Sequence, residues 1–352
     1  MQNPAASTLQ PGIDFAGLDR SVRPQDDFYR FVNGAWLDRT PIPPDYASYG
    51  SFHEVFEKAE RDLRALVEEA AANEDAAAGS DARRVGDFYR SYMDAARADA
   101  LGHAPLAEEL ARVDGLRTVS EVAAAMAHIF VLGAETPLHG SVDQDARRSD
   151  RYIVYIGQGG LGLPDRDFYL LEDPKFAAIR VAYEAHVATM LRLIEVPDPE
   201  AEAAGILALE TCLAGHHWTQ VENRDEEARY NKLDRAGLAD LAPRVDWGAY
   251  LSVLGAADQT EVVVAQPSFL RGLDGLLGTI GMEAWRVYLK WHLVSGYAGC
   301  LAREFVDAHF DFYFRTLSGI EEIRPRWKRA IAEIDESLGE ALGRMYVDRH
   351  FP

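Results

Sequence analysis

Residues 175–195, KFAAIRVAYEAHVATMLRLIE, follow Pro174 and repeat apolar side chains at intervals of three and four. This interval is typical of one face of an amphipathic α-helix. The same pattern recurs in further long segments, at 200–221, 283–298, 302–317 and 325–346. Shorter amphipathic stretches begin at Ser51, Asp81 and Val119. The sequence therefore predicts a mainly α, multi-helical fold.

One region departs from the helical period. Residues 138–157 alternate apolar and polar side chains on either side of a polar centre, which predicts a small β-hairpin. Residues 261–265, EVVVA, form a second short β-like run. The glycine-rich stretch Gly157–Gly162 lacks the strand–GxGxxG–helix context and a following Lys-Ser or Lys-Thr. We therefore expect a tight turn with close backbone packing there, and not a phosphate loop.

Local signals suggest how the N-terminal part is organised. Residues 1–22 contain Pro and Gly breaks and predict an arm, followed by one helical region over 23–352 with a possible internal boundary near 234–246. Gly34 suggests the end of a helix. Ser51 with Glu54 predicts a capping box for the next helix, whose apolar face would hold Val55, Phe56, Leu63, Leu66 and Val67.

Composition narrows the range of partners. The 352 residues carry 57 acidic and 36 basic side chains, a formal net charge of −21, which argues against binding to nucleic acid or to an anionic membrane surface. No signal peptide and no run of 18 apolar residues is present, so the cytoplasm is the simplest compartment. The two cysteines, Cys212 and Cys300, favour buried free thiols over a disulfide. Arginine outnumbers lysine, 31 to 5, which correlates with a bacterial source.

The sequence contains no recognisable set of catalytic residues. A helical zinc site needs two histidines at i and i+4, and none of the ten histidines has such a partner. The segment from His53 to Glu57 has the length of the zinc-binding motif but ends in glutamate where the motif has its second histidine. His216 and His217 are adjacent and therefore point to different faces of a helix. No Gly-x-Ser-x-Gly elbow occurs, and acidic pairs such as Glu226-Glu227 suggest solvated side chains. The residues alone indicate an acidic, mostly helical protein without a visible active site.

Several motifs resemble those of one enzyme family. They are VRPQDDFYRFVNGAWL at 22–37, GLGLPDRDFYL at 160–170, HWTQVENRD at 217–225, YNKL at 230–233, DFYFRTLSG at 311–319 and RPRWKR at 324–329. In order and spacing they resemble the neprilysin and endothelin-converting-enzyme family of zinc metalloendopeptidases, which includes bacterial oligoendopeptidase O. The resemblance extends from residue 13 to Pro352.

The resemblance implies that this chain is the N-terminal part of a two-lobed metallopeptidase. In that family the C-terminal part carries a His-Glu-x-x-His helix, a later Glu ligand to zinc, and an Asn-Ala-Tyr/Phe strand that binds the substrate. None of these motifs occurs here. The resemblance thus implies zinc in the complete enzyme, no zinc bound by this chain, no catalytic residue within it, and two partners, an oligopeptide substrate and the missing C-terminal catalytic half.

Two residues are candidates for substrate binding by the same resemblance. In the animal enzymes an arginine directly before the Tyr-Gly-x-Phe motif grips the terminal carboxylate of the substrate, and an aspartate follows that motif. Here Ser48 and His53 occupy those positions, on either side of Tyr49–Phe52. Serine cannot form the bidentate ion pair that arginine offers a carboxylate. Plain endopeptidase activity is therefore the better expectation.

Three hypotheses remain open at this point. The first is the N-terminal, substrate-enclosing portion of a zinc endopeptidase, inactive by itself. The second is a non-catalytic peptide-binding or regulatory protein derived from that family, and the third an unrelated hydrolase with an unrecognised carboxylate pair. On the first hypothesis, apolar helix residues such as Phe305, Phe310, Phe312 and Leu342 would lie partly uncovered.

Overall fold

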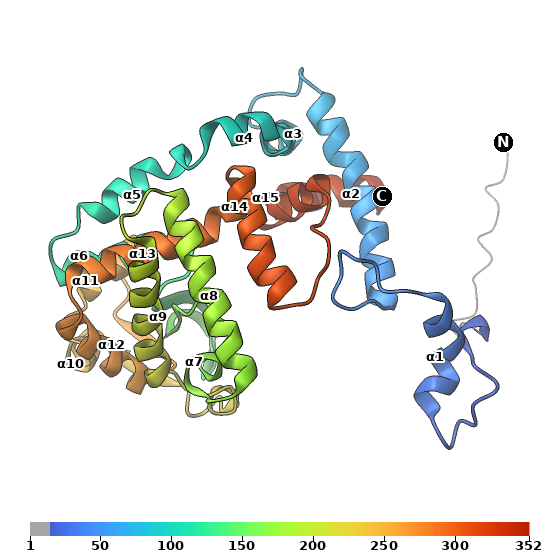
Figure 1. Cartoon of the computed structure of the whole chain (residues 1–352). Coiled ribbons are helices and arrows are strands. Elements are labelled where there is room, and N and C mark those ends of the chain that lie inside the picture. Colours follow the sequence, from blue (N-terminus) through green and yellow to red (C-terminus); the bar gives the residue numbers. More distant parts are fainter. Residues whose placement is uncertain (1–14, 352) are drawn as a thin grey trace. The chain divides into compact units, whose positions relative to one another are not determined.

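The computed structural model describes residues 15–351 and is mainly helical over that range, as the sequence predicted (Figure 1). Its contacts divide the chain into two compact units. The terminal unit comprises residues 1–86 and 320–352, and the central unit comprises residues 87–319. Of the predicted arm, residues 1–14 lie outside the described part of the chain. The suggested boundary near 234–246 lies within the central unit and stays a prediction.

The terminal unit is built on two long helices. Helix α2 (Ser51–Ala72) packs against α15 (Arg326–His350), which is kinked at Leu338. The buried apolar side chains of this pair are Leu66, Val67 and Ala70 on α2 and Ala330, Ile331, Ile334, Ala341 and Leu342 on α15. The unit also contains the short turn η1 (Phe15–Gly17), α1 (Phe28–Arg39) and the start of α3 (Asp81–Met93).

The central unit holds the remaining helices. In chain order they are α4 (Ala95–Leu101), η2 (Ala104–Leu106), α5 (Ala107–Asp114), α6 (Val119–Val131), α7 (Asp167–Leu170), α8 (Pro174–Leu193), α9 (Pro199–His216), η3 (Glu222–Arg224), α10 (Arg235–Leu241), α11 (Trp247–Val253), α12 (Pro267–Thr279), α13 (Met282–Tyr297), η4 (Ala298–Cys300), α14 (Arg303–His309) and the π-helical turn η5 (Phe310–Thr316). Helices α8 and α9 run side by side (Figure 1).

A four-stranded sheet lies among the helices of the central unit. The predicted hairpin is present as β1 (Leu138–Asp145) and β2 (Arg148–Gln158). The predicted run at 261–265 is also present, as β4 (Glu261–Val264), which pairs in parallel with β2. The strand β3 (Asn231–Asp234), which the sequence analysis missed, pairs antiparallel with β4, giving the order β1-β2-β4-β3.

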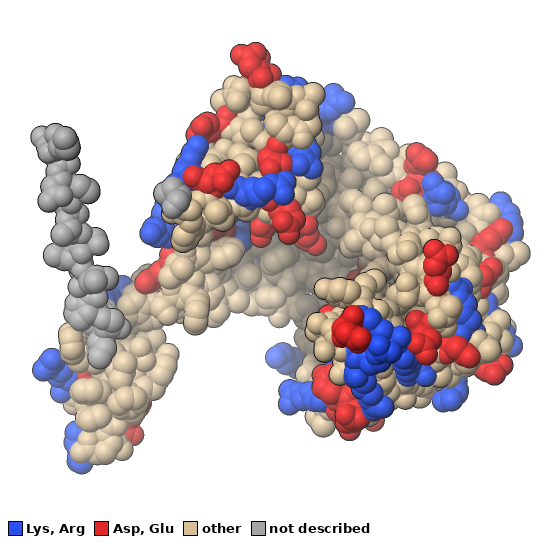
Figure 2. All heavy atoms as spheres, turned by 180° about the vertical axis from the view of Figure 1, so that it is seen from behind, with Lys and Arg blue, Asp and Glu red and all other residues tan. Residues whose placement is uncertain are grey.

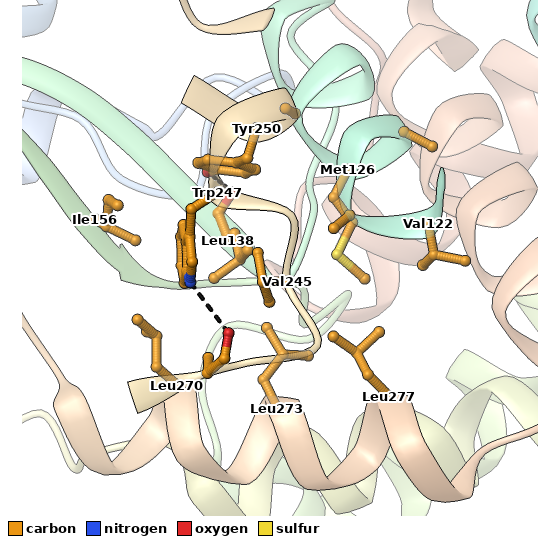
Figure 3. Packing of buried hydrophobic residues seen from close by; sticks show 14 of the residues in the cluster. Val122, Met126, Leu138, Ile156, Val245, Trp247, Tyr250, Leu270, Leu273 and Leu277 are labelled. Carbon is orange, nitrogen blue, oxygen red and sulfur yellow. Dashed lines mark hydrogen bonds between the residues drawn. The ribbon is translucent and has the colours of Figure 1, made fainter. Parts of the chain in front are cut away.

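Two apolar clusters form the core of the central unit. One lies where the sheet meets α6, α11 and α12, and includes Val122, Leu138, Trp247, Tyr250 and Leu273 (Figure 3). The indole of Trp247 donates to the carbonyl oxygen of Ala242 at 3.1 Å, so its polar atom is satisfied inside the core (Figure 3). The other cluster lies between α8, α9, α13 and α14. Phe305, Phe310 and Phe312 are buried there or beside it, and Leu342 is buried in the terminal unit, so the expectation that these residues lie uncovered was wrong.

Two local predictions in the terminal unit were also wrong. Gly34 lies within α1 and does not end it. A Cβ at this position would lie 2.5 Å from the Cβ of Asp19, which leaves no room for a larger residue. Close packing therefore requires the glycine, not a helix terminus. The N-cap of α2 is Gly50, with no side-chain cap. The Glu54 carboxylate instead accepts a hydrogen bond from the indole of Trp36 at 3.1 Å, so no capping box forms at Ser51.

Further differences follow from tertiary packing. Leu66 and Val67 are buried on α2 as expected, but Val55 and Phe56 are 68% and 55% exposed. The predicted helix over 302–317 is divided into α14 and the π-helical turn η5. Cys212 and Cys300 are free, as expected, but both are exposed rather than buried.

Surface charge is mixed on the face of the molecule drawn in Figure 2, where basic side chains lie next to acidic ones. In the central unit Arg147 pairs with Glu227 at 2.6 Å and Arg229 with Glu226 at 3.3 Å. Both glutamates are exposed, as the sequence suggested. Among the described residues, no helix has the length and apolar composition needed to cross a bilayer.

Candidate functional site

The central unit contains a cleft of about 550 Å³. Its wall brings together the glycine-rich loop after β2, the segment after α9 and the π-helical turn η5, all of which belong to the sequence motifs at 160–170, 217–225 and 311–319. The lining residues are Glu135, His139, Gln158 to Asp167, His217, Trp218, Gln220, Asn223, Tyr313 and Leu317. A cleft of this size is in the range of small-molecule and peptide sites.

Rings from the core fix the glycine-rich loop by its carbonyl oxygens. His217 Nε2 lies 3.1 Å from the oxygen of Gly159, and the hydroxyls of Tyr288 and Tyr313 donate to Gly160 and Gly162 at 2.7 and 3.0 Å. A Cβ on Gly162 would lie 1.9 Å from the Tyr183 hydroxyl, and Gly160 has φ +82°. The tight turn with close backbone packing expected for Gly157–Gly162 is therefore confirmed.

A buried carboxylate supports the loop from behind. Glu210, on α9, is fully buried and accepts hydrogen bonds from the hydroxyls of Tyr169 (2.7 Å) and Tyr183 (2.8 Å). His292 Nε2 lies 3.0 Å from the same carboxylate. The Tyr169 hydroxyl in turn accepts from the amide of Leu163 at 2.8 Å. A chain of hydrogen bonds thus connects α9 to the loop that lines the cleft.

Burial changes the acidity of these groups. It raises the pKa of Tyr169 and Tyr183 well above the usual tyrosine value, and the nearby Glu210 charge adds to the effect. Both tyrosines therefore stay protonated and act as donors to the carboxylate. Burial also lowers the pKa of His217 to about 4, partly opposed by its contact with Gly159, so its imidazole is neutral at pH 7.

The sequence analysis missed Glu210, Tyr169 and Tyr183. The signal available for Glu210 was a glutamate inside the apolar run ILALETCLAG at 206–215 of a predicted helix. A charged side chain on an apolar face is rarely buried without partners. The identity of those partners depends on three separate elements, and no spacing in the chain indicates it.

The two residues proposed from the resemblance lie in the terminal unit. Ser48 is exposed in the loop before α2, and His53 lies half-buried in the first turn of α2. The His53 ring is stacked with Tyr49 at 5.5 Å between centroids and packs edge-on against Tyr46 at 5.3 Å. His53 Nδ1 is buried and has no hydrogen-bond partner among the described residues. The arrangement is an aromatic platform with one unpaired imidazole nitrogen.

The cations beside this platform are already paired. Lys328 lies 3.5 Å from Asp45 and 3.7 Å from Glu60, and Arg324 pairs with Glu60. Both side chains also lie over the Tyr46 ring, within 6 Å of its centroid. These charges therefore stabilise the contact of α2 with α15. They do not offer a free cation next to Ser48.

The described residues do not fit a zinc ion. Over residues 15–351 no group of three or more His, Cys, Asp or Glu side chains converges on one point. His217 is held at the Gly159 carbonyl and His292 at Glu210, while His216 is exposed. The first two imidazoles are engaged within the protein, so we derive no chemical step through a metal from this chain.

Comparisons with known proteins place this architecture among peptidases. The zinc metalloprotease Zmp1 of Mycobacterium tuberculosis, solved in complex with an inhibitor, superposes with a TM-score of 0.92 at 38% identity, over 97% of this chain and 52% of that one. PepO from Lactobacillus rhamnosis shares the fold, with a TM-score of 0.77 at 22% identity over 94% of this chain and 52% of that one. Human endothelin-converting enzyme 1 is 27% identical over 96% of this chain and 45% of that enzyme.

The fold is thus that of one helical lobe of a metallopeptidase. The family profile of peptidase family M13 matches residues 24–352, and the chain belongs to that family. The resemblance to the neprilysin and endothelin-converting enzymes is confirmed. The chain spans about half the length of the relatives it matches. It corresponds to the N-terminal half of such a protein.

Proposed function

We propose that this chain is the substrate-enclosing, N-terminal portion of a zinc-dependent endopeptidase that cleaves oligopeptides. The observation that carries the proposal is the match to peptidase family M13 along residues 24–352, in a chain that spans about half the length of its relatives. On this proposal the zinc ion and the general base lie outside these 352 residues, and the chain alone is inactive. A second partner, besides the peptide, is then the catalytic half.

Within this function we propose that Ser48 and His53 contact the substrate. Their positions on either side of the Tyr49–Phe52 motif support it, as does the exposed loop that carries Ser48. His53 is half-buried, so part of its side chain is accessible to a substrate. We also propose a bacterial, cytoplasmic enzyme, which the two free cysteines and the excess of arginine over lysine support.

A reconstitution experiment tests the proposal. The purified, tag-free 352-residue chain is dialysed and its zinc measured, and its turnover of a fluorogenic peptide panel is compared with that of a longer protein that carries a His-Glu-x-x-His segment. We expect far less than one zinc per short chain and only background turnover, against chelator-sensitive cleavage by the longer protein. Stoichiometric zinc that survives dialysis, or chelator-sensitive turnover by the short chain, would contradict the proposal.

A further inference from the structure

Two histidines with buried ring nitrogens lie where α8 meets α14 and η5. His186 on α8 is 6% exposed, and His309 at the end of α14 is half-buried. Within the described part of the chain, His186 Nε2 and His309 Nδ1 are buried and have no hydrogen-bond partner. The two rings lie 6.3 Å apart between centroids. Both imidazoles fit this environment only in the neutral form, because an imidazolium has two N–H groups that each need an acceptor.

The histidine pair packs against the aromatic side chains of η5. The His186 ring is stacked with Phe312 at 5.0 Å and lies edge-on to Tyr313 at 5.5 Å between centroids. The His309 ring lies 4.6 Å from that of Tyr313. The π-helical turn itself is closed by a bond from the amide of Leu317 to the carbonyl oxygen of Phe312 at 2.9 Å. Turns of this type are rare and are frequent at functional sites.

The same turn forms part of the wall of the cleft. Tyr313 and Leu317 line the cleft, and the Tyr313 hydroxyl donates to the carbonyl oxygen of Gly162 at 3.0 Å. A movement of η5 away from α8 would break this hydrogen bond and remove this wall. The histidine pair and the cleft are therefore connected through η5.

The groups that face the pair do not stabilise a positive charge. Tyr313 is the titratable group in ring contact with both histidines. Asp311 lines a pocket of about 380 Å³ together with His186, but its carboxylate pairs with Arg315. The other acids within five positions of either histidine are Glu184, Glu304 and Asp307. Among residues 15–351 no carboxylate pairs with either imidazole.

Helix α13 contributes an aromatic neighbour to the pair. Trp291 lies edge-on to His186 at 5.5 Å between centroids, and its indole donates to the Glu210 carboxylate at 3.3 Å. Burial lowers the pKa of His186 to about 3, with a smaller effect from His309, and burial lowers the pKa of His309 to about 4. Because both values lie below the usual 6.5, an open form with exposed rings binds protons more readily. The closed form therefore loses stability as the pH falls below 6.5.

We propose that His186 and His309 form an acid-sensitive latch on the cleft. At neutral pH the two uncharged rings hold η5 against α8. Below about pH 6, protons bind to the rings when the turn opens, and the two like charges then oppose closure. The turn stays released, Tyr313 leaves the carbonyl of Gly162, and the cleft loses this wall.

Hydrogen exchange of the 352-residue chain at pH 7 and pH 5, followed by mass spectrometry, tests the proposal. After correction for the intrinsic exchange rate, the protection of the η5 amides should fall by about 20-fold for each of the two histidines. At pH 5 the amides of α6, which lies in the other apolar cluster, should stay at least about tenfold better protected than those of η5. Unchanged protection of η5, or protection equal to that of α6 at pH 5, would overturn the proposal.

Variants identify the groups that titrate. His186→Phe combined with His309→Phe keeps two aromatic rings that cannot bind protons, and the protection of η5 should then change by less than about threefold. His309→Phe alone, at the half-buried position, should lose one of the two factors of about 20 and decides the question if the double variant does not fold. A full wild-type response in these variants would show that the pair is not the latch.

The matched control is His216→Phe combined with His350→Phe. Both residues are exposed and belong to α9 and α15, not to the elements of the latch. The control should keep the wild-type fall in protection, and loss of that fall would overturn the assignment to His186 and His309. No peptide and no zinc enter this measurement, so its failure would leave the proposed function untouched.

Discussion

His217 shows how a single residue of a family motif can have a structural role. The side chain is 8% exposed, packs edge-on against Phe269 at 4.8 Å between ring centroids, and holds the Gly159 carbonyl. The sequence predicted that the neighbours His216 and His217 point to different faces, and His217 is buried while His216 is exposed. Within the motif HWTQVENRD, His217 thus holds the loop of the cleft.

The lowered pKa of His217 predicts a pH-dependent stability. The folded value of about 4 lies below the usual 6.5, so the unfolded chain binds the proton more readily and stability falls as pH drops below 6.5. From pH 7 to 5 this group costs the wild type about 2 kcal/mol. His217→Gln, which does not titrate, should lose about that much less over the same interval in urea unfolding.

His216→Gln is the control for this measurement, because His216 is the exposed neighbour. If His216→Gln reduces the loss of stability as much as His217→Gln does, the assignment to the buried imidazole is wrong. If the His217→Gln curve follows the wild-type curve between pH 7 and 5, the buried imidazole is not the group that titrates.

Ser48 is the residue at which substrate preference can be altered. Ser48→Arg, in the longer protein that carries the zinc site, should raise the preference for free-acid over amidated peptides by about threefold to fivefold, because a bidentate exposed ion pair at the upper end of the usual range is worth about 0.6–1 kcal/mol. The nearby His53 would modulate this through its own charge. The ratio of kcat/KM for acid and amide peptides measures the change.

Ala47→Arg places the same charge one residue earlier in the same exposed loop. It should leave the ratio close to that of the wild type. An unchanged ratio in Ser48→Arg would mean that residue 48 does not face the substrate.

At the scale of elements, hydrogen bonds from helices determine the shape of the cleft. The loop after β2 has little regular structure. The Tyr288 hydroxyl on α13 holds it directly, and Glu210 on α9 holds it through the Tyr169 hydroxyl. Each of these rings or carboxylates is buried, so their mutual bonds are made away from competing water. The loop therefore depends on buried contacts with three helices for its shape.

Removal of one hydroxyl tests this connection. Tyr169→Phe leaves the Leu163 amide without its acceptor and Glu210 without one donor, and should lower the free energy of unfolding by about 1–3 kcal/mol. Tyr152→Phe, at an exposed tyrosine of β2, should change it by less than about 0.5 kcal/mol. Equal values for the two variants would show that the buried network contributes nothing.

Helix ends and strands differ in how well local sequence predicts them. The amphipathic period correctly predicted the long helices, because the residues that a helix buries on one face recur at spacings of three and four. The predictions at Gly34 and Ser51 were wrong because they depend on contacts with residues distant along the chain. Asp19 packs against Gly34, and Trp36 binds the Glu54 carboxylate that was expected to complete the capping box. Strand β3 was missed since four residues are too few to show a period.

At the scale of the whole chain, the largest exposed apolar side chains of α2 lie on one stretch of surface. Phe52, Val55 and Phe56 are 89%, 68% and 55% exposed, and their spacing of three and four puts them on one helix face. Apolar surface gathered in one place usually marks an interaction site. The net charge of −21 opposes aggregation of the chain through this surface.

A hydrophobic dye should report this face. We expect the 352-residue chain to bind the dye, and Phe52→Ser combined with Phe56→Ser to reduce the fluorescence by at least about twofold. Val142→Ser with Tyr152→Ser is the control, since these residues are also exposed but belong to the hairpin and not to α2. A compact monomer without dye binding would argue for a self-sufficient domain and favour the regulatory hypothesis.

The sequence alone determined the helical class, the hairpin, the glycine turn and the family, because each depends on local periodicity or on ordered motifs. Tertiary structure decided which motif residues meet. The cleft joins Arg166, His217 and Tyr313, which lie up to 147 positions apart, and the carbonyl oxygens of its glycine-rich loop accept hydrogen bonds from core rings. Such contacts are set by packing between elements, and no spacing along the chain encodes them.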